Sequence, residues 1–256
     1  MDRESLREAT RITLKDPYSA DSITLGMKSR DGLLIEEFYL KEMGSPSPKA
    51  EVYDNILCLS IRSEALSGRP VLEESPVLKE SPVLIVLQPG GPGNLDKTRW
   101  LLEAAASGIV LIGMEVRKGE PLDKTVSRAL RVVSYADLRR DIIGRDRIFL
   151  YGEGEPGTRA LIAGALDERV AGIMVLDPEV RFPIEGERSL STAEAAGLLP
   201  PRRLACLGLP DIRDIFAETT AAYARMGKGS RLRLETGRSE GLLKELSLWV
   251  TEQEDV

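Results

Sequence analysis

The sequence contains no histidine among its 256 residues. A chain without histidine cannot build a Ser-His-Asp or Cys-His pair from its own residues, because an imidazole takes the proton from the nucleophile in such sites. Zinc sites that use histidine are excluded too, so we expect no bound metal. Nucleophilic chemistry would require another base, or a histidine supplied by a second subunit.

Cysteine and long apolar runs are also scarce. Cys58 and Cys206 each lie in an apolar, strand-like run, so we expect buried free thiols and no disulfide. No apolar run is long enough to span a bilayer, and the charged residues 1–21 do not resemble a secretory signal. We therefore expect a cytoplasmic protein without a membrane partner. The net charge of -6 argues against nucleic acid as a partner.

Short apolar runs alternate with amphipathic stretches along most of the chain. This alternation predicts an α/β fold with a mostly parallel central sheet and helices on both faces. An antiparallel hairpin is expected at residues 22–41, where alternating segments flank an Arg30-Asp31-Gly32 turn. The runs expected to form neighbouring parallel strands begin near Val83, Gly108, Ile148, Ala171, Leu204 and Arg231. Helices are expected between the strands, at residues 96–107, 122–143, 158–166, 212–226 and 241–251.

The length suits one domain, which we assign to residues 22–256, with residues 1–21 as an N-terminal extension. A repeat of Pro-Val-Leu runs through residues 70–84. It predicts an extended surface insertion at 66–82, because repeated prolines exclude a regular helix or a central strand. The polar stretch at 178–203 is long enough to form a short lid.

A glycine-rich turn joins the strand at 148–151 to the helix at 158–166. One hypothesis is a nucleophile elbow of the type Gly-x-Ser-x-Gly, in which a strained turn exposes a serine above the sheet. In this alignment Gly152 is the first glycine, Gly154 occupies the serine position and Pro156 replaces the second glycine. The simplest alternative is a turn that only joins the two elements.

The same turn matches the dinucleotide pattern Gly-x-Gly-x-x-Gly through its three glycines, the last being Gly157. Asp177 follows 20 residues later, about where a ribose-binding acid is expected. Glu153 and Glu155 would crowd the phosphates, however, and this site normally follows the first strand of its domain. A dinucleotide-binding protein is therefore the minor alternative, and we expect no cofactor.

Taken together, the hairpin, the Pro-Gly-Gly-Pro-Gly loop at 89–93, the long helix and the glycine turn resemble the α/β-hydrolases. Within that family, the sequence resembles the acetyl xylan esterase-like and dipeptidyl-peptidase-like branches. The resemblance implies a three-layer sandwich and a catalytic triad. It places the nucleophile at Gly154, the acid at Asp211 or Asp214, and the histidine at Glu240.

The resemblance also implies a pocket around the turn, formed by Gly90, Gly91, Gly152, Glu153 and Glu155. Backbone N–H groups there could shape an oxyanion site, but the two carboxylates disfavour a negative charge. We therefore expect a catalytically degenerate α/β-hydrolase-fold protein that serves as a binding, scaffold or assembly module. Its partner would be an unidentified small molecule or protein, and it could form a homo-oligomer or pair with an active hydrolase.

The alternative is an active esterase- or peptidase-like hydrolase. It would use Glu153 and Glu155 as acid and base, or a histidine from another subunit.

Overall fold

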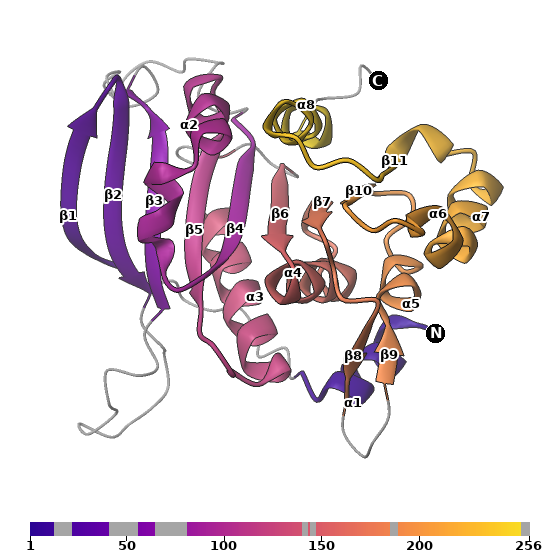
Figure 1. The fold of residues 1–256 in the computed structure, drawn as a ribbon. Helices are drawn as coiled ribbons and strands as arrows, with labels where there is room; N and C mark the ends of the chain where they lie inside the picture. The colour runs from indigo at the N-terminus through magenta and orange to yellow at the C-terminus, as the bar shows by residue number, and fades with distance from the viewer. Residues whose placement is uncertain are drawn as a thin grey trace.

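A nine-stranded sheet runs through the computed structural model, with helices packed against it (Figure 1). The structure describes residues 1–12, 22–40, 56–64, 81–139, 143, 147–184 and 189–251. The surface insertion predicted at 66–82 lies outside these residues, apart from Ser81 and Pro82.

The predicted hairpin and the predicted parallel strands are both confirmed. The first three strands pair antiparallel, and the third pairs antiparallel with β5. From β5 to β11 the six neighbouring strands are parallel. In spatial order the strands are β1 (Ser22–Arg30), β2 (Leu33–Leu40), β3 (Ile56–Ser63), β5 (Val110–Val116), β4 (Val83–Pro89), β6 (Ile148–Glu153), β7 (Val170–Leu176), β10 (Arg203–Leu207) and β11 (Leu232–Glu235).

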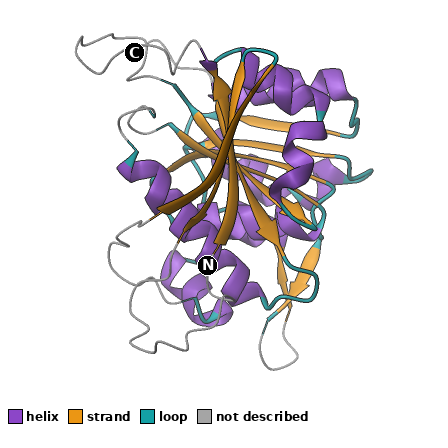
Figure 2. Ribbon diagram, turned by 90° about the vertical axis from the view of Figure 1, so that its left-hand side faces the viewer, coloured by secondary structure: helices purple, strands orange, loops and turns teal. Residues whose placement is uncertain are grey.

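Helices cover both faces of the sheet, as predicted (Figure 2). On one face α2 (Arg99–Ala106) and α8 (Glu240–Thr251) pack against each other and against the sheet. On the other face lie α3 (Leu122–Leu138) and α4 (Glu155–Leu166), and α1 (Arg3–Thr10) packs against α4. The central strands are therefore buried on both sides, which is why their sequences are almost continuously apolar.

The predicted helices differ in their bounds from those in the structure, and two of them differ most. The helix predicted at 212–226 is divided into α6 (Ile212–Ile215) and α7 (Ala217–Arg225). Phe216 interrupts it with φ -101° and ψ 21°, and its side chain is fully buried, so core packing of the ring accompanies the break. The helix predicted at 122–143 ends earlier, at Leu138. A 3-10 helix, η4 (Pro92–Lys97), precedes α2, and another, η5 (Gly229–Arg231), precedes β11.

The segment predicted as a short lid, 178–203, contains regular structure. Strands β8 (Arg181–Pro183) and β9 (Ser189–Ser191) form a two-stranded sheet, and α5 (Thr192–Ala196) follows with a capping box between Ser191 and Glu194. Its role as a lid stays a prediction. Among the described residues, we find no helix with the length and apolarity needed to cross a bilayer.

The chain reverses its direction of winding between β4 and β6. From β4 the sheet grows to one side through β5, whereas β6, β7, β10 and β11 follow one another on the other side. In open α/β sheets, ligands bind outside the carboxyl ends of the strands at such a switch point. The glycine turn after β6 lies at this position.

Candidate functional site

Gly154 is the single residue between the end of β6 and the start of α4. Its backbone has φ 63° and ψ -133°, a conformation that side chains disfavour and glycine tolerates. Its N–H donates to the carbonyl of Leu176 at 2.8 Å, which ties the turn to the end of β7. No described atom lies within 4 Å of the place where a Cβ would sit. The turn therefore has the sharp, open form of a nucleophile elbow but carries no side chain.

Gly152 and Gly157 let the helix approach the strand. A Cβ on Gly152 would lie 2.6 Å from the Pro156 carbonyl oxygen and 2.7 Å from the Gly157 nitrogen. A Cβ on Gly157 would lie 2.7 Å from the Gly152 carbonyl oxygen. The elbow alignment placed Pro156 at the second glycine, whereas the structure gives the close contact to Gly157. The signal was present in the sequence, as the last glycine of the dinucleotide pattern.

The carboxyl ends of four strands lie in a row beside this turn. Backbone hydrogen bonds connect each strand end to the next: Gly154 N–H to Leu176 O (2.8 Å), Asp177 N–H to Leu207 O (2.9 Å) and Gly208 N–H to Glu235 O (2.9 Å). The loops after β7, β10 and β11 therefore all open on the same edge of the sheet as Gly154.

Asp177 and Arg238 meet across this edge. The Arg238 Nη1 donates to Asp177 Oδ2 at 2.9 Å, which joins the loop before α8 to the end of β7. The resemblance implies the histidine in that same loop, at Glu240, but it places the acid after β10, at Asp211 or Asp214, whereas Asp177 follows β7. The sequence analysis considered Asp177 only as a ribose-binding acid and missed Arg238. The Arg238 side chain is 67% exposed, so the pair is screened by solvent.

The other residues implied for the triad are exposed and do not contact one another through side-chain hydrogen bonds or ion pairs among the described residues. Asp211 and Asp214 are exposed at α6, and Glu240 is exposed at the first position of α8. Among the described residues, no side-chain hydrogen bond or ion pair involves Asp211, Asp214 or Glu240. Their assignment to the acid and histidine positions stays a prediction.

The carboxylates of the turn have different surroundings. Glu153 is exposed and makes no side-chain hydrogen bond or ion pair with a described residue. Glu155 pairs with Arg159, which is buried and also donates to Thr125 Oγ1 at 2.6 Å. Burial raises the pKa of Glu179, and the negative charge of Glu155 raises it further. The sequence analysis did not identify Glu179.

The predicted pocket glycines end β4 beside the turn. Gly90 and Gly91 have φ values of 76° and 107°, and no described atom lies within 4 Å of a Cβ built on either. A cavity of about 180 Å³ opens next to them, between the ends of β4 and β6. Three larger hollows lie elsewhere, one beside Trp249, one between α7 and β11, and one beside the C-terminal end of α1. Only the cavity at the switch point is next to the elbow among these described hollows.

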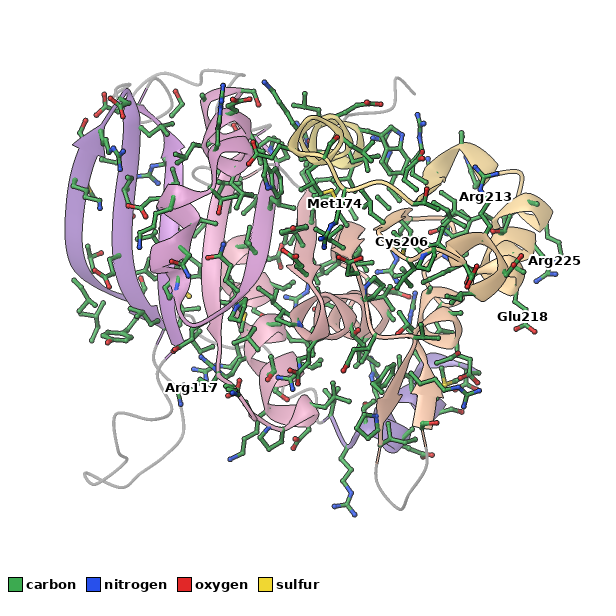
Figure 3. The ribbon with its side chains drawn as sticks, viewed as in Figure 1. Arg117, Met174, Cys206, Arg213, Glu218 and Arg225 are labelled. Carbon is green, nitrogen blue, oxygen red and sulfur yellow. The ribbon has the colours of Figure 1, made fainter. Side chains whose placement is uncertain are left out.

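The cysteines are buried free thiols, as predicted (Cys206 is labelled in Figure 3). Burial raises the pKa of Cys58 to about 12 and also raises that of Cys206. Both stay protonated at neutral pH, so neither provides a nucleophilic thiolate. We expect no reaction of the native protein with Ellman's reagent and release of two equivalents in denaturant. Fast native labelling, followed by absorbance, would contradict the burial of both thiols.

Comparison with known proteins identifies relatives by structure alone. No protein-family model matches the chain, and no curated protein matches it. A glucuronoyl esterase from Solibacter usitatus has a TM-score of 0.69 at 12% identity, over 97% of this chain and 91% of the other. An acetyl xylan esterase from Paenibacillus sp. R4 has a TM-score of 0.60 at 12% identity, over 97% and 92%. A glucuronoyl esterase from Teredinibacter turnerae T7901 has a TM-score of 0.67 at 12% identity, over 97% and 83%. At these identities the likeness shows the fold alone.

Proposed function

We propose that this chain, which has the α/β-hydrolase fold, is catalytically degenerate and acts as a binding module. The observation that carries the proposal is the empty nucleophile position. The elbow keeps its sharp backbone, yet Gly154 has no hydroxyl and the chain has no imidazole to activate one. Ester hydrolysis on this fold needs both groups, because the base must take a proton from the nucleophile and return it to the leaving group.

The charges around the elbow support the same proposal. An oxyanion hole stabilises negative charge with N–H donors, and the resemblance assigns this part to the N–H groups of Gly91 and Glu155. The carboxylates of Glu153 and Glu155 are exposed beside them and disfavour a negative charge. Such a site is better suited to hold a ligand than to stabilise the transition state of ester cleavage.

The test is reaction with a fluorophosphonate probe and turnover of p-nitrophenyl acetate by the purified protein. We expect no covalent labelling, and at most slow turnover of about 10³-fold over water from the remaining backbone donors. Substituting Gly154→Ser alone is expected to change little, because the serine has no base. Robust turnover that is lost on Glu153→Gln or Glu155→Gln would replace this proposal with carboxylate catalysis.

One observation favours that second candidate, an active hydrolase for ester bonds. Acid-base catalysis by two carboxyl groups needs one with a raised pKa and one that stays ionised. Burial raises the pKa of Glu179, and the negative charge of Glu155 raises it further. A histidine supplied by another subunit would be the other route to activity. Mixing the purified protein with a partner hydrolase and measuring ester turnover tests this route. For the binding module, we propose a cytoplasmic location and a small-molecule or protein partner.

A further inference from the structure

The side chains of Gln88 and Glu153 share one face of the sheet at the switch point. Val86 on β4 is paired in register with Tyr151 on β6, and both side chains belong to the core under α2 and α8. Because side chains alternate along a strand, the residues two positions further on point to the same side. Both Gln88 and Glu153 line the cavity of about 180 Å³.

Two hydrogen-bond acceptors of this cavity have no described donor, although the donor-bearing side chains of Asn94 and Thr98 also line it. The amide oxygen of Gln88 is buried, and it has no hydrogen-bond partner among the described residues. Glu153 brings a carboxylate that likewise has no partner among them. None of the described residues that line the cavity is lysine or arginine. A buried acceptor left without a donor destabilises the protein, so a ligand that donates hydrogen bonds would restore what is missing.

The apolar end of the cavity presents aromatic and aliphatic surface. Trp100 and Tyr151 are 4% and 6% exposed, and their rings meet edge to face with centroids 5.1 Å apart. Leu101 and Leu243 complete this side and are buried as well. Burial raises the pKa of Tyr151, and the negative charges of Glu153 and Asp177 raise it further. The cavity therefore combines a negative potential with aromatic rings, a combination that attracts organic cations.

The size of the cavity limits the ligand. Drug-sized ligands occupy about 300–1,000 Å³, whereas an apolar cavity of about 150 Å³ is enough for benzene. A volume of about 180 Å³ thus suits one ring or a short chain with one polar group.

We propose that this cavity binds a small primary ammonium ion, with its N–H donors on Gln88 and Glu153 and its apolar body against Trp100 and Leu243. The inference rests on the proposed function, since an elbow without a nucleophile leaves a bound ligand intact. It assigns a ligand class to the site beside the elbow: a single-ring or short-chain amine, charged at neutral pH.

Benzylammonium is the probe, and Trp100 is the reporter. In a Trp249→Phe background Trp100 is the remaining tryptophan, so its fluorescence reports on the cavity. We expect saturable binding with a Kd of about 1 mM or tighter. Benzyl alcohol, which has the same shape without the charge, is expected to bind at least about tenfold more weakly. Benzoate, which reverses the charge, is expected not to bind.

Two substitutions and one control locate the ammonium group. Glu153→Gln removes the charge at an exposed position and is expected to weaken benzylammonium at least about tenfold. Glu218→Gln is the matched control, because it removes the same charge from an exposed position on α7 that does not line the cavity, and it should leave the affinity within about twofold. Gln88→Leu removes the unpaired acceptor, so it should weaken binding while the protein stays folded.

Equal affinity for benzylammonium and benzoate, or an unchanged affinity in Glu153→Gln, would overturn the ammonium assignment. The ester assay separates this failure from that of the proposed function. A protein that neither turns over esters nor binds benzylammonium loses only the assignment made here. A protein that turns over esters loses the degenerate assignment, whatever the amine titration gives.

Discussion

The double variant Gly154→Ser/Arg238→His is expected to gain reaction with a fluorophosphonate probe and turnover of p-nitrophenyl acetate. Gly154 occupies the elbow, and there is open space for the new hydroxyl, although φ of 63° strains any side chain there. Arg238 already reaches Asp177, so a histidine at this position has a carboxylate to orient it. A base in this position contributes about 10²–10⁴-fold in enzymes. We expect the lower end, about 10²-fold over Gly154→Ser alone.

Histidine is shorter than arginine, so the loop must move towards Asp177 for the pair to form. Residues 236–239 lie outside helix and strand, which leaves this movement available. Gly154→Ser/Glu240→His is the matched comparison, because it places the histidine where the family pattern implies it. It is expected to gain less than the Arg238 variant, since position 238 already pairs with the carboxylate of Asp177, whereas Glu240 has no side-chain partner among the described residues.

Adding Asp177→Asn to the Arg238 variant should remove most of the gain, because an amide does not stabilise an imidazolium. If the Glu240 variant proved the better enzyme, the acid would be Asp211 or Asp214 and the family pattern would be right.

The fold could be predicted from the sequence because its central strands are almost entirely apolar. β4 and β7 are buried on both faces, and a short, continuously apolar run of this kind is typical of a central strand of a parallel sheet. The break at Phe216 could not be predicted. The residues on both sides of it are compatible with a helix, and the buried position of the ring depends on the tertiary structure.

The candidate site could be predicted only where it depends on residues that are close together in the sequence. The elbow is a local feature, so the glycine spacing and the flanking strand and helix are enough to indicate it. The pair of Asp177 and Arg238 joins residues 61 positions apart, and it exists because the ends of β7, β10 and β11 are neighbours in the sheet. The cavity likewise depends on β4 lying next to β6, which the order of strands in the chain does not give.

Gly152→Ala is expected to lower the free energy of unfolding by at least about 3 kcal/mol. The new methyl group would lie 2.6 Å from the Pro156 carbonyl oxygen and 2.7 Å from the Gly157 nitrogen. Both are backbone atoms at the start of α4, whose residues from Pro156 to Leu166 are all buried. No side chain can rotate away, so the helix itself must shift out of the core.

Substitutions at two other glycines distinguish the effect of this steric contact from the effect of backbone conformation. Urea denaturation measures the free energy of unfolding of each variant. Gly93→Ala should change the free energy of unfolding by less than about 0.5 kcal/mol, because no described atom lies within 4 Å and its φ is not positive. Gly154→Ala should lose about 1–2 kcal/mol through its φ of 63°, since there is space for the methyl group. A loss at Gly152 no larger than at Gly154 would show that the strand and helix can separate. If the losses fall in the order Gly152, Gly154 and Gly93, the close approach of Gly152 and Gly157 stabilises the elbow. Glycine at position 154 then avoids the backbone strain that a nucleophile with a side chain causes in an active hydrolase.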